Sequence, residues 1–488
     1  MRLAPLDTLC ALSDEALAAL RSSFVAAGYT PSVVADCERI APGLVDGLRL
    51  PLVQAELRAA PTPGRTLARL LLYLDVVDET EVTALLGVTT TRDLLEAGAL
   101  AHADGGLRAA VIVAPCFELY VLSDPLDAHA DAVMGPGPTT LHLAEALPRA
   151  AVASVLDVGC GAGTLALLAA SRGAQTAVGV DISPRAVAIS TLNARLNGVR
   201  ARFVVSDLCA AVAGERFDLV VSQPAFIAQP PDVDASVFAH GGPRGDELAL
   251  RLLAELPGLL REGGSAVVLV QSATPAEAPL HQRARAALGA SAAGLMVLTA
   301  PSMGPDAYSI GYATMVDASL GARWREAALR YRAHLRAMSV ESFQYGLVCV
   351  RADGLGYTLT LPVLGLRGLG ADALQGLADG LALAARADDA LLDAGVRCAD
   401  GVAWIEERDR PDSATRPRWI ARFRALPFAD RELSEASWAL LELLDVSARV
   451  RDAVTAYARL CDADPREVAP QVLGFVRDSL ARGLLAPS

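Results

Sequence analysis

The stretch Val155–Gly163 constrains the fold of this chain more than any other. It reads Val-Leu-Asp-Val-Gly-Cys-Gly-Ala-Gly, so a short apolar run breaks into three glycines at alternate positions, and a helical pattern follows from Thr164. Glycine is used where a backbone takes positive φ or lies flat against a ligand, and a helix N-terminus offers free N–H groups. The stretch predicts a strand, a tight turn and a helix, forming either an ordinary turn of a parallel sheet or a ligand-binding loop.

Length and charge limit the classes of protein to which this chain can belong. With 488 residues it is too long for one hydrophobic core, so two or three domains are expected. The net charge of −13 makes nucleic acid an unlikely partner, because phosphate backbones demand a basic surface. No apolar run is long enough to span a bilayer, and the first residues lack a secretory pattern, which predicts a cytoplasmic protein without membrane contacts. Its cysteines and histidines show no metal-ligand spacing, so no metal site is expected.

The order of expected elements divides the chain into three parts. Residues 1–123 read as helices followed by short extended pieces, and the order of elements from residue 65 to residue 113 is typical of a winged helix. Such a part either binds DNA or packs and dimerises beside a catalytic domain. The first 125 residues hold 9 arginines against 16 acidic residues, which favours packing and makes a homodimer one expected assembly. Residues 124–320 alternate strands and helices, and residues 321–488 read as an α+β accessory part.

The alternation in residues 124–320 predicts an α/β fold with a parallel, doubly wound sheet. A hairpin of residues 295–299 and 310–316 is expected to complete this sheet, and a second hairpin, of residues 343–350 and 357–362, is expected in the C-terminal part. Ligands of doubly wound sheets bind at the carboxyl ends of the strands. Besides the glycine turn, three such ends carry candidate residues, namely Asp181 with Ile182, Asp207 with Leu208, and Ser222 with the residues up to Phe226.

The position of Asp181 and the glycine spacing bear on the ligand. Asp181 lies 18 residues after Gly163, where a carboxylate can accept hydrogen bonds from ribose hydroxyls. Dinucleotide-binding folds use the same geometry, so this carboxylate alone does not distinguish NAD from another adenosine ligand. The tight G-x-G-x-G spacing differs from G-x-G-x-x-G, and Asp157, which opens the turn, suits a cation better than a pyrophosphate.

Together these motifs resemble the class I S-adenosylmethionine-dependent methyltransferases over residues 139–316. The resemblance implies a Rossmann-like core and S-adenosyl-L-methionine as cofactor. In such a core, Asp157 and the glycine turn would hold the methionine part, Asp181 would take the ribose hydroxyls, and Asp207 would bind the adenine amino edge. The residues that we expect to bind the cofactor are Asp157, Gly159, Cys160, Gly161, Gly163, Asp181, Ile182, Asp207, Leu208 and Ser222.

The segment Ser222-Gln-Pro-Ala-Phe226 looks like a variant of the Asn-Pro-Pro-Tyr/Phe motif of amino-methylating enzymes, such as HemK-type glutamine methyltransferases and several nucleobase methyltransferases. In that motif a side-chain carbonyl and a proline carbonyl accept hydrogen bonds from an –NH₂ group while the aromatic ring stacks on it, so catalysis is chiefly positioning. Gln223 and Ala225 depart from the motif, which leaves a different nitrogen or an oxygen nucleophile open. The residues expected to act on the acceptor are Gln223, Pro224, Phe226 and His240, the last as a candidate general base.

The expected function is methyl transfer from S-adenosylmethionine to a nitrogen, less readily an oxygen, of a small molecule or peptide. One alternative is a protein-glutamine or rRNA-base N-methyltransferase. Another is a cofactor-binding winged-helix regulator without turnover. The sequence does not identify the acceptor, the oligomeric state or the role of the C-terminal part.

Overall fold

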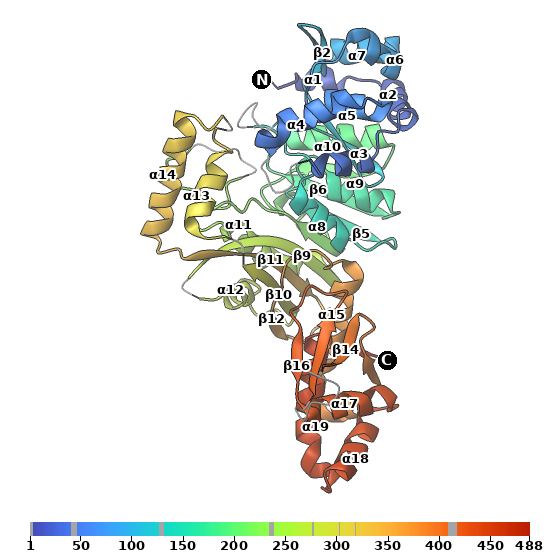
Figure 1. Cartoon of the computed structure of the whole chain (residues 1–488), viewed down its shortest axis with the longest axis vertical. Coiled ribbons are helices and arrows are strands. Elements are labelled where there is room, and N and C mark those ends of the chain that lie inside the picture. The colour runs from blue at the N-terminus through green and yellow to red at the C-terminus, as the bar shows by residue number, and fades with distance from the viewer. Residues whose placement is uncertain are drawn as a thin grey trace.

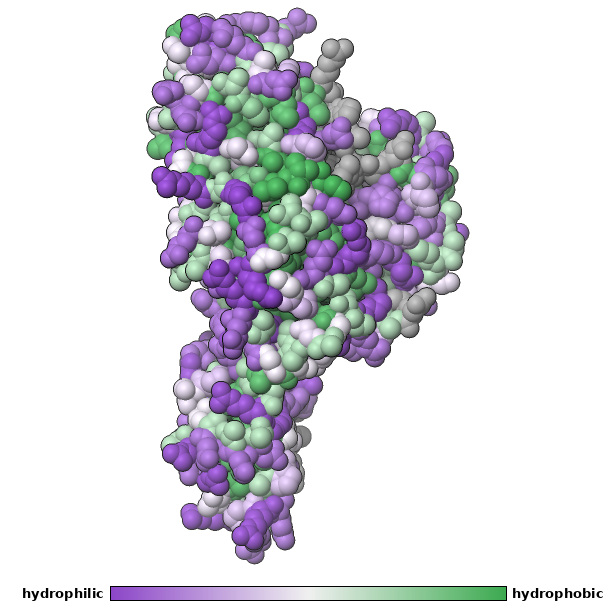
Figure 2. Space-filling model, turned by 180° about the vertical axis from the view of Figure 1, so that it is seen from behind, coloured by the Kyte–Doolittle hydropathy of each residue, from purple (hydrophilic) through white to green (hydrophobic). Residues whose placement is uncertain are grey.

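The computed structural model describes residues 3–40, 46–125, 131–233, 239–275, 278–301, 303–317, 319–407 and 417–488. The molecule is elongated, with the N-terminal helices at one end, a large sheet in the middle and the C-terminal elements at the other end (Figure 1). Seen from behind, hydrophobic side chains gather on the wider half of the molecule, and the narrower C-terminal end is more polar (Figure 2). Within the described ranges, no helix combines the length and apolar character needed to cross a membrane.

The N-terminal part consists of helices and short hairpins. The order of α5, α6, α7 and the β1–β2 hairpin agrees with the expected helices and extended pieces, and a winged-helix role stays a prediction. Its elements are α1 (Leu6–Cys10), α2 (Asp14–Ala26), α3 (Pro31–Glu38), α4 (Asp46–Ala59), α5 (Pro63–Leu71), α6 (Glu79–Leu86), α7 (Val88–Glu96), β1 (Leu100–Ala103), β2 (Gly106–Ala109), β3 (Ile112–Cys116) and β4 (Leu119–Ser123).

The middle part contains the large sheet and the helices that cover it. Its elements are α8 (Pro138–Ala146), β5 (Ser154–Val158), α9 (Thr164–Ser171), β6 (Thr176–Asp181), α10 (Pro184–Asn197), β7 (Arg202–Val205), the short 3₁₀ helix η1 (Ala210–Val212), β8 (Phe217–Ser222), α11 (Glu247–Leu259), β9 (Leu260–Thr274), α12 (Leu280–Ala287), β10 (Gly294–Pro301), α13 (Pro305–Ala313), α14 (Ala322–Ala337), β11 (Ser342–Arg351) and β12 (Thr358–Pro362).

In the described residues the sheet has eight strands in the order β12-β10-β11-β9-β8-β5-β6-β7. The strands from β9 to β7 are parallel, as the alternation of strands and helices predicts, and β11 is antiparallel to both of its neighbours. The chain order of the parallel strands reverses between β5 and β8, and in open α/β sheets ligands bind at such a point. The Rossmann-like fold that the resemblance implies is therefore confirmed.

Helices cover both faces of the sheet, and successive side chains of a strand point to opposite faces, so neighbouring residues enter different cores. Val155 belongs to the core that contains α8, α9 and α10, whereas its neighbour Leu156 belongs to the core that contains α11 and α12. Both side chains are almost fully buried, and burying an aliphatic side chain stabilises the fold by about 1.5–3 kcal/mol. The apolar run that opens the glycine stretch is therefore a central strand.

The expected hairpin at the sheet edge is wrong. Residues 305–313 form α13 instead of a strand, and the strand that pairs with β10 in antiparallel fashion is β11, which also pairs with β9. Residues 343–350 and 357–362 are strands, as expected, but they lie on opposite sides of β10 and do not pair with each other. The sheet thus continues beyond residue 320, at which we placed the domain boundary, and helices α13 and α14 form an insertion between two of its strands.

Beyond the sheet, the C-terminal part has its own hydrophobic core, in which α17, α18 and α19 pack with short strands. Its elements are α15 (Ala371–Ala384), α16 (Asp388–Leu392), β13 (Val396–Cys398), β14 (Val402–Glu407), β15 (Arg418–Phe423), β16 (Arg431–Leu433), α17 (Glu435–Val446), α18 (Val450–Leu460), α19 (Pro465–Ala481) and β17 (Leu485–Pro487).

Two buried asparagines on α10 join the N-terminal part to the sheet. The side chain of Asn197 accepts a hydrogen bond from the Tyr120 N–H and donates one to the Tyr120 carbonyl, both at 2.8 Å. Asn193 makes the same pair of bonds with Leu122, also at 2.8 Å. Each amide therefore satisfies the backbone of β4 as a neighbouring strand would, which fixes the N-terminal part against the helix that follows β6.

Candidate cofactor and acceptor site

The glycine turn joins β5 to α9 at the carboxyl end of the sheet. Gly159, Gly161 and Gly163 have φ values of 71°, 53° and 84°, a region that favours glycine. At Gly163 a Cβ atom would also lie 2.7 Å from the Ser190 Cβ and 3.0 Å from the Phe203 ring, so glycine is required there on steric grounds as well. The turn thus takes the conformation that the sequence predicts.

The turn is fixed to the neighbouring strand β6 by backbone and carboxylate contacts. The N–H groups of Gly159 and Cys160 both donate to the Val180 carbonyl, at 2.8 and 3.0 Å. Asp181 accepts a hydrogen bond from the Gly161 N–H with one oxygen, at 2.9 Å. Burial raises the pKa of Asp181 above its usual value and raises that of the Cys160 thiol more strongly, so Cys160 is a neutral packing residue.

Asp157 is the most strongly buried carboxyl of the turn, at 2 % exposure. One of its oxygens accepts a hydrogen bond from the Ala166 N–H in the first turn of α9, at 3.1 Å. Burial raises the pKa of Asp157 to about 7, because the charged form loses its hydration and the single hydrogen bond compensates only in part. The carboxyl is therefore divided between charged and neutral forms near neutral pH, and a cationic ligand would favour the charged form.

The ends of β6 and β7 place further candidate residues at the same edge of the sheet. Ile182 is 56 % exposed although it is apolar, so it offers a hydrophobic surface next to Asp181. Asp207 is exposed and forms an ion pair with Arg251 at 3.2 Å. Leu208 is buried with a φ of 45°. A carboxylate, an apolar surface and an arginine thus lie beyond β6 and β7.

The end of β8 leads into residues Ser222–Phe226, which we name the acceptor segment for its predicted role. Ser222 is fully buried, and its hydroxyl donates to the Val158 carbonyl at 2.7 Å, so it joins β8 to β5. The next side chain, Gln223, is held by α8, because the Thr140 hydroxyl donates to its Oε1 atom at 3.1 Å. The sequence gives no signal for this contact, since 83 residues separate the two.

A glycine-rich loop packs directly against the backbone of Phe226. A Cβ atom on Gly241 would stand 2.6 Å from the Phe226 Cα and 2.7 Å from the Ala225 carbonyl oxygen. On Gly245 it would stand 2.4 Å from the Phe226 carbonyl oxygen. His240 begins this loop and forms a parallel bridge with Ile227. The loop therefore supports the acceptor segment from one side, and the two glycines permit the close approach.

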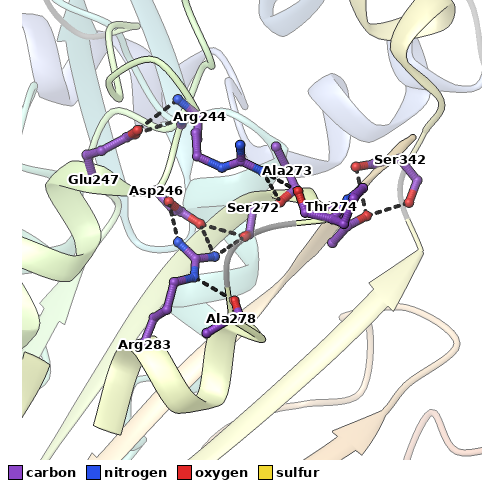
Figure 3. A network of polar contacts seen from close by, with 11 residues as sticks. Arg244, Asp246, Glu247, Ser272, Ala273, Thr274, Ala278, Arg283 and Ser342 are labelled. Atoms are coloured by element: carbon purple, nitrogen blue, oxygen red, sulfur yellow. Dashed lines mark hydrogen bonds and ion pairs between the residues drawn. The ribbon is translucent and has the colours of Figure 1, made fainter. Parts of the chain in front are cut away.

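A polar network anchors the loop where it leads into α11 (Figure 3). The Glu247 carboxylate accepts hydrogen bonds from the N–H groups of Arg244 and Gly245, at 2.9 and 3.0 Å. Asp246 is 1 % exposed and accepts two hydrogen bonds from the Arg283 guanidinium on α12, at 3.0 and 2.7 Å. Ser272 at the end of β9 donates to Asp246 at 2.5 Å and accepts from Arg283 at 2.8 Å. The buried charge of Asp246 is therefore paired.

The α13–α14 insertion adds an aromatic wall. The Tyr308 hydroxyl accepts a hydrogen bond from the Ala228 N–H at 2.7 Å, so α13 is tied to the backbone just after Phe226. One turn later, the Tyr312 hydroxyl donates to the Gln271 Oε1 atom at 3.2 Å, and burial raises the pKa of Tyr312 to about 12. Both hydroxyls stay protonated near neutral pH, and Tyr312, which lines the cavity, can contact a ligand only as a neutral group.

One cavity of about 1270 Å³ connects all of these segments. Every residue that the sequence predicts for the site lines it except Gly163, whose role is to begin α9. Sequence reasoning did not predict the contributions of Arg185, Arg251, Tyr312 and Met315 to its wall. Arg185 comes four residues after Asp181, so its closeness to that residue in the sequence could have predicted its place at the cavity. Tyr312 comes from the insertion, which only the folded chain brings to the cavity.

Comparison with known proteins supports the same interpretation. Residues 136–292 match the family described as methyltransferase small domain. A release factor glutamine methyltransferase of Rhodospirillum rubrum is 33% identical over 233 residues, covering 45% of this chain and 68% of that protein. This chain belongs to the class I S-adenosylmethionine-dependent methyltransferases.

Two further relatives are also named as protein methyltransferases. A putative protein N5-glutamine methyltransferase of Methanocaldococcus jannaschii is 36% identical over 124 residues, covering 25% of this chain and 62% of that protein. A ribosomal protein L11 methyltransferase of Dechloromonas aromatica is 43% identical over 131 residues, covering 26% of this chain and 40% of that protein. The methyltransferase chain thus spans between 40% and 68% of these three relatives.

Proposed function

We propose that this chain transfers a methyl group from S-adenosylmethionine to a nitrogen atom of a peptide or small-molecule acceptor. The observation that carries the proposal is the single cavity that joins the glycine turn, Asp181 and Asp207 to the Gln223–Phe226 segment. Its volume of about 1270 Å³ exceeds the roughly 300–1,000 Å³ of ordinary ligand sites. A cofactor and an acceptor group therefore fit side by side.

The residues of the cavity suit the parts of this cofactor. Asp157 and the glycine turn would hold the cationic methionine part, which favours the charged form of that carboxyl. Asp181 would accept hydrogen bonds from the ribose hydroxyls, and Ile182 offers an apolar surface beside it. Asp207 would take the adenine amino group at the exposed end of the cavity.

When bound, S-adenosylmethionine supplies a methyl group on a positively charged sulfur. The contribution of the chain is orientation, which makes the reaction of two bound groups effectively unimolecular. Gln223 and the Pro224 carbonyl would fix the polar atoms of the acceptor, and the Phe226 ring would stack on its plane. His240 is exposed on the cavity wall and would accept the proton that the nitrogen loses.

Among acceptors, a polypeptide amide has the most support. Two of the relatives are named for the methylation of a glutamine, in one case that of a release factor. A planar amide also matches a site made of an aromatic ring and neutral hydrogen-bonding groups. Transfer of labelled methyl groups from S-adenosylmethionine to a purified bacterial release factor, compared with ribosomes and with total extract, would identify the acceptor class.

Calorimetry with S-adenosylmethionine tests the cofactor part of the proposal. Asp181→Ala removes charged hydrogen bonds worth about 1.5–3 kcal/mol each, so affinity should fall at least ~10-fold. Asp400→Ala is the control, because Asp400 is 84 % exposed in the C-terminal part. Absence of binding by the wild-type protein, or equal binding by Asp181→Ala, would refute the proposal.

A further inference from the structure

The contact between Thr140 and Gln223 orients the side-chain amide of Gln223. Thr140 is 8 % exposed, and its oxygen accepts a hydrogen bond from the Gly137 N–H at 3.3 Å. Its hydroxyl hydrogen is thereby free to point at Gln223, where it donates to Oε1 at 3.1 Å. A continuous donor chain thus runs from the start of α8 into the acceptor segment and ends on the carbonyl oxygen of the glutamine side chain.

This chain of hydrogen bonds pairs the carbonyl oxygen of Gln223 and leaves the –NH₂ group as the unpaired end of the side chain among the described residues. The side-chain amide is planar, with a carbonyl oxygen that accepts and an –NH₂ group that donates. Because Oε1 is turned toward Thr140, Nε2 lies on the other side of the amide. Nε2 makes no hydrogen bond to the described residues and is not among their buried unpaired polar atoms. Nε2 is therefore accessible to solvent, and since Gln223 is part of the cavity wall, we take its two N–H donors to be available to a ligand there.

The residue after Gln223 offers the opposite polarity. Pro224 has no N–H group, and across the described chain its carbonyl receives no hydrogen bond although the residue is buried. The acceptor segment thus presents N–H donors from Gln223 and a free carbonyl from Pro224. An asparagine whose carbonyl accepted from the acceptor –NH₂ group, as in the motif that this segment resembles, would present two hydrogen-bond acceptors instead.

We propose that Thr140 is a positioning residue that holds Gln223 as a hydrogen-bond donor toward the methyl acceptor. The acceptor group that complements this arrangement carries an oxygen acceptor beside a nucleophilic N–H, as a carboxamide does. An amine lacks the oxygen, and a carboxylate lacks the N–H. This inference rests on the proposed function and gives Gln223 a role opposite to that of the side chain it replaces.

Gln223→Glu tests the polarity, because it keeps the shape of the side chain and replaces the –NH₂ donor by an acceptor oxygen. Loss of the donor, together with repulsion between two oxygens, should lower kcat/KM for methyl transfer at least ~10-fold. Affinity for S-adenosylmethionine should be retained or increased, since the added charge is negative and the cofactor is cationic. Unchanged or faster transfer by Gln223→Glu would overturn the inference, because it would show that the residue acts as an acceptor.

Thr140→Val tests the positioning role at nearly constant volume. It should raise KM for the acceptor several-fold with little change in cofactor affinity, and Thr140→Ser should restore the wild-type value because it restores the hydroxyl. Thr191→Val is the matched control, since the Thr191 hydroxyl donates to the Val187 carbonyl within its own helix and has no other partner in the described part of the chain. Equal KM values for Thr140→Val and the wild type would overturn the role of Thr140.

The assay uses the full chain and tritiated S-adenosylmethionine. The acceptor is a bacterial release factor or an extract, in which the transferred tritium is then counted. Cofactor affinity is measured by calorimetry on the same samples. A wild-type chain that binds the cofactor and labels neither the proteins nor the small molecules of the extract would refute the proposed function and this inference together. A wild-type chain that transfers methyl groups, with variants that do so equally well, would refute this inference alone.

Discussion

The buried ion pair between Asp246 and Arg283 gives the sharpest test of how the glycine-rich loop of residues 240–246 is held. Asp246 is 1 % exposed and Arg283 is 18 % exposed. Arg283→Met removes both guanidinium contacts and, among the described residues, leaves the Ser272 hydroxyl as the one partner of a buried charge. Breaking such a pair from one side costs about 3–5 kcal/mol, because the remaining charge is uncompensated. The local free energy of opening around α11 and α12 should fall by that amount.

Hydrogen exchange of the full chain measures this local opening, and a loss of about 3–5 kcal/mol corresponds to at least ~100-fold faster exchange. Peptides that cover α11 should show it. Arg202→Met provides the matched control, since the Arg202–Glu215 pair is 48 % and 41 % exposed and such pairs contribute about 0–1 kcal/mol. Replacing Asp246 as well, in Asp246→Leu/Arg283→Met, should recover most of the loss because no unpaired charge remains. Exchange within ~3-fold of wild type for Arg283→Met alone would refute the reasoning.

Further predictions concern the turn, the loop and the insertion. With the pKa of Asp157 raised to about 7, the folded chain keeps a proton that the unfolded chain loses near pH 4. The free energy of unfolding should therefore fall as pH rises from ~4 to ~7, by roughly 4 kcal/mol in total. Asp157→Asn should raise the Tm of the cofactor-free protein at pH 8 and weaken cofactor binding. A Tm of this variant below that of the wild type would contradict the prediction. Gly241→Ala places a Cβ among backbone atoms at 2.6–2.7 Å, so methyl transfer should drop ~10-fold or more, whereas Gly258→Ala, which meets nothing within 4 Å, should leave transfer unchanged. Tyr308→Phe leaves the Ala228 N–H unpaired, at a cost of about 1–3 kcal/mol, and should lower Tm and acceptor turnover more than cofactor affinity. Tyr331→Phe, at an equally buried position, is the control. Equal effects of the two variants would argue against the role of the Tyr308 hydroxyl.

Local patterns in the sequence were sufficient for the core of the site. The alternation of strands and helices placed the candidate residues at strand ends, and parallel strands bring these ends to one edge of a sheet. The glycine turn, Asp181, Asp207 and the Gln223–Phe226 segment line one cavity. Their common location could be predicted without knowing any long-range contact. Their roles toward the cofactor and the acceptor stay predictions until binding and transfer are measured.

The same reasoning failed for residues 310–316, because long-range strand pairing decides which segment lies beside β10. Residues 310–316 have an apolar pattern compatible with a strand, yet β11 takes the position beside β10 because it can pair with β9 and β10 at once. A strand that pairs on both sides satisfies twice as many backbone groups as one at an edge. The residues between β10 and β11 are thereby released to form α13 and α14, and Tyr312 reaches the cavity from there.

The sequence by itself determined the glycine turn, the order of the parallel strands β5 to β9 along the chain and the carboxylates at their ends. All of these depend on backbone conformation and on side-chain periodicity within a few residues. Only the tertiary structure decided that Thr140 bonds to Gln223 and that Arg283 compensates the charge of Asp246. It also decided that the α13–α14 insertion forms part of the cavity wall. Such contacts join residues that are tens of positions apart, and their partners are selected by packing and charge compensation in the folded chain, for which no local pattern exists.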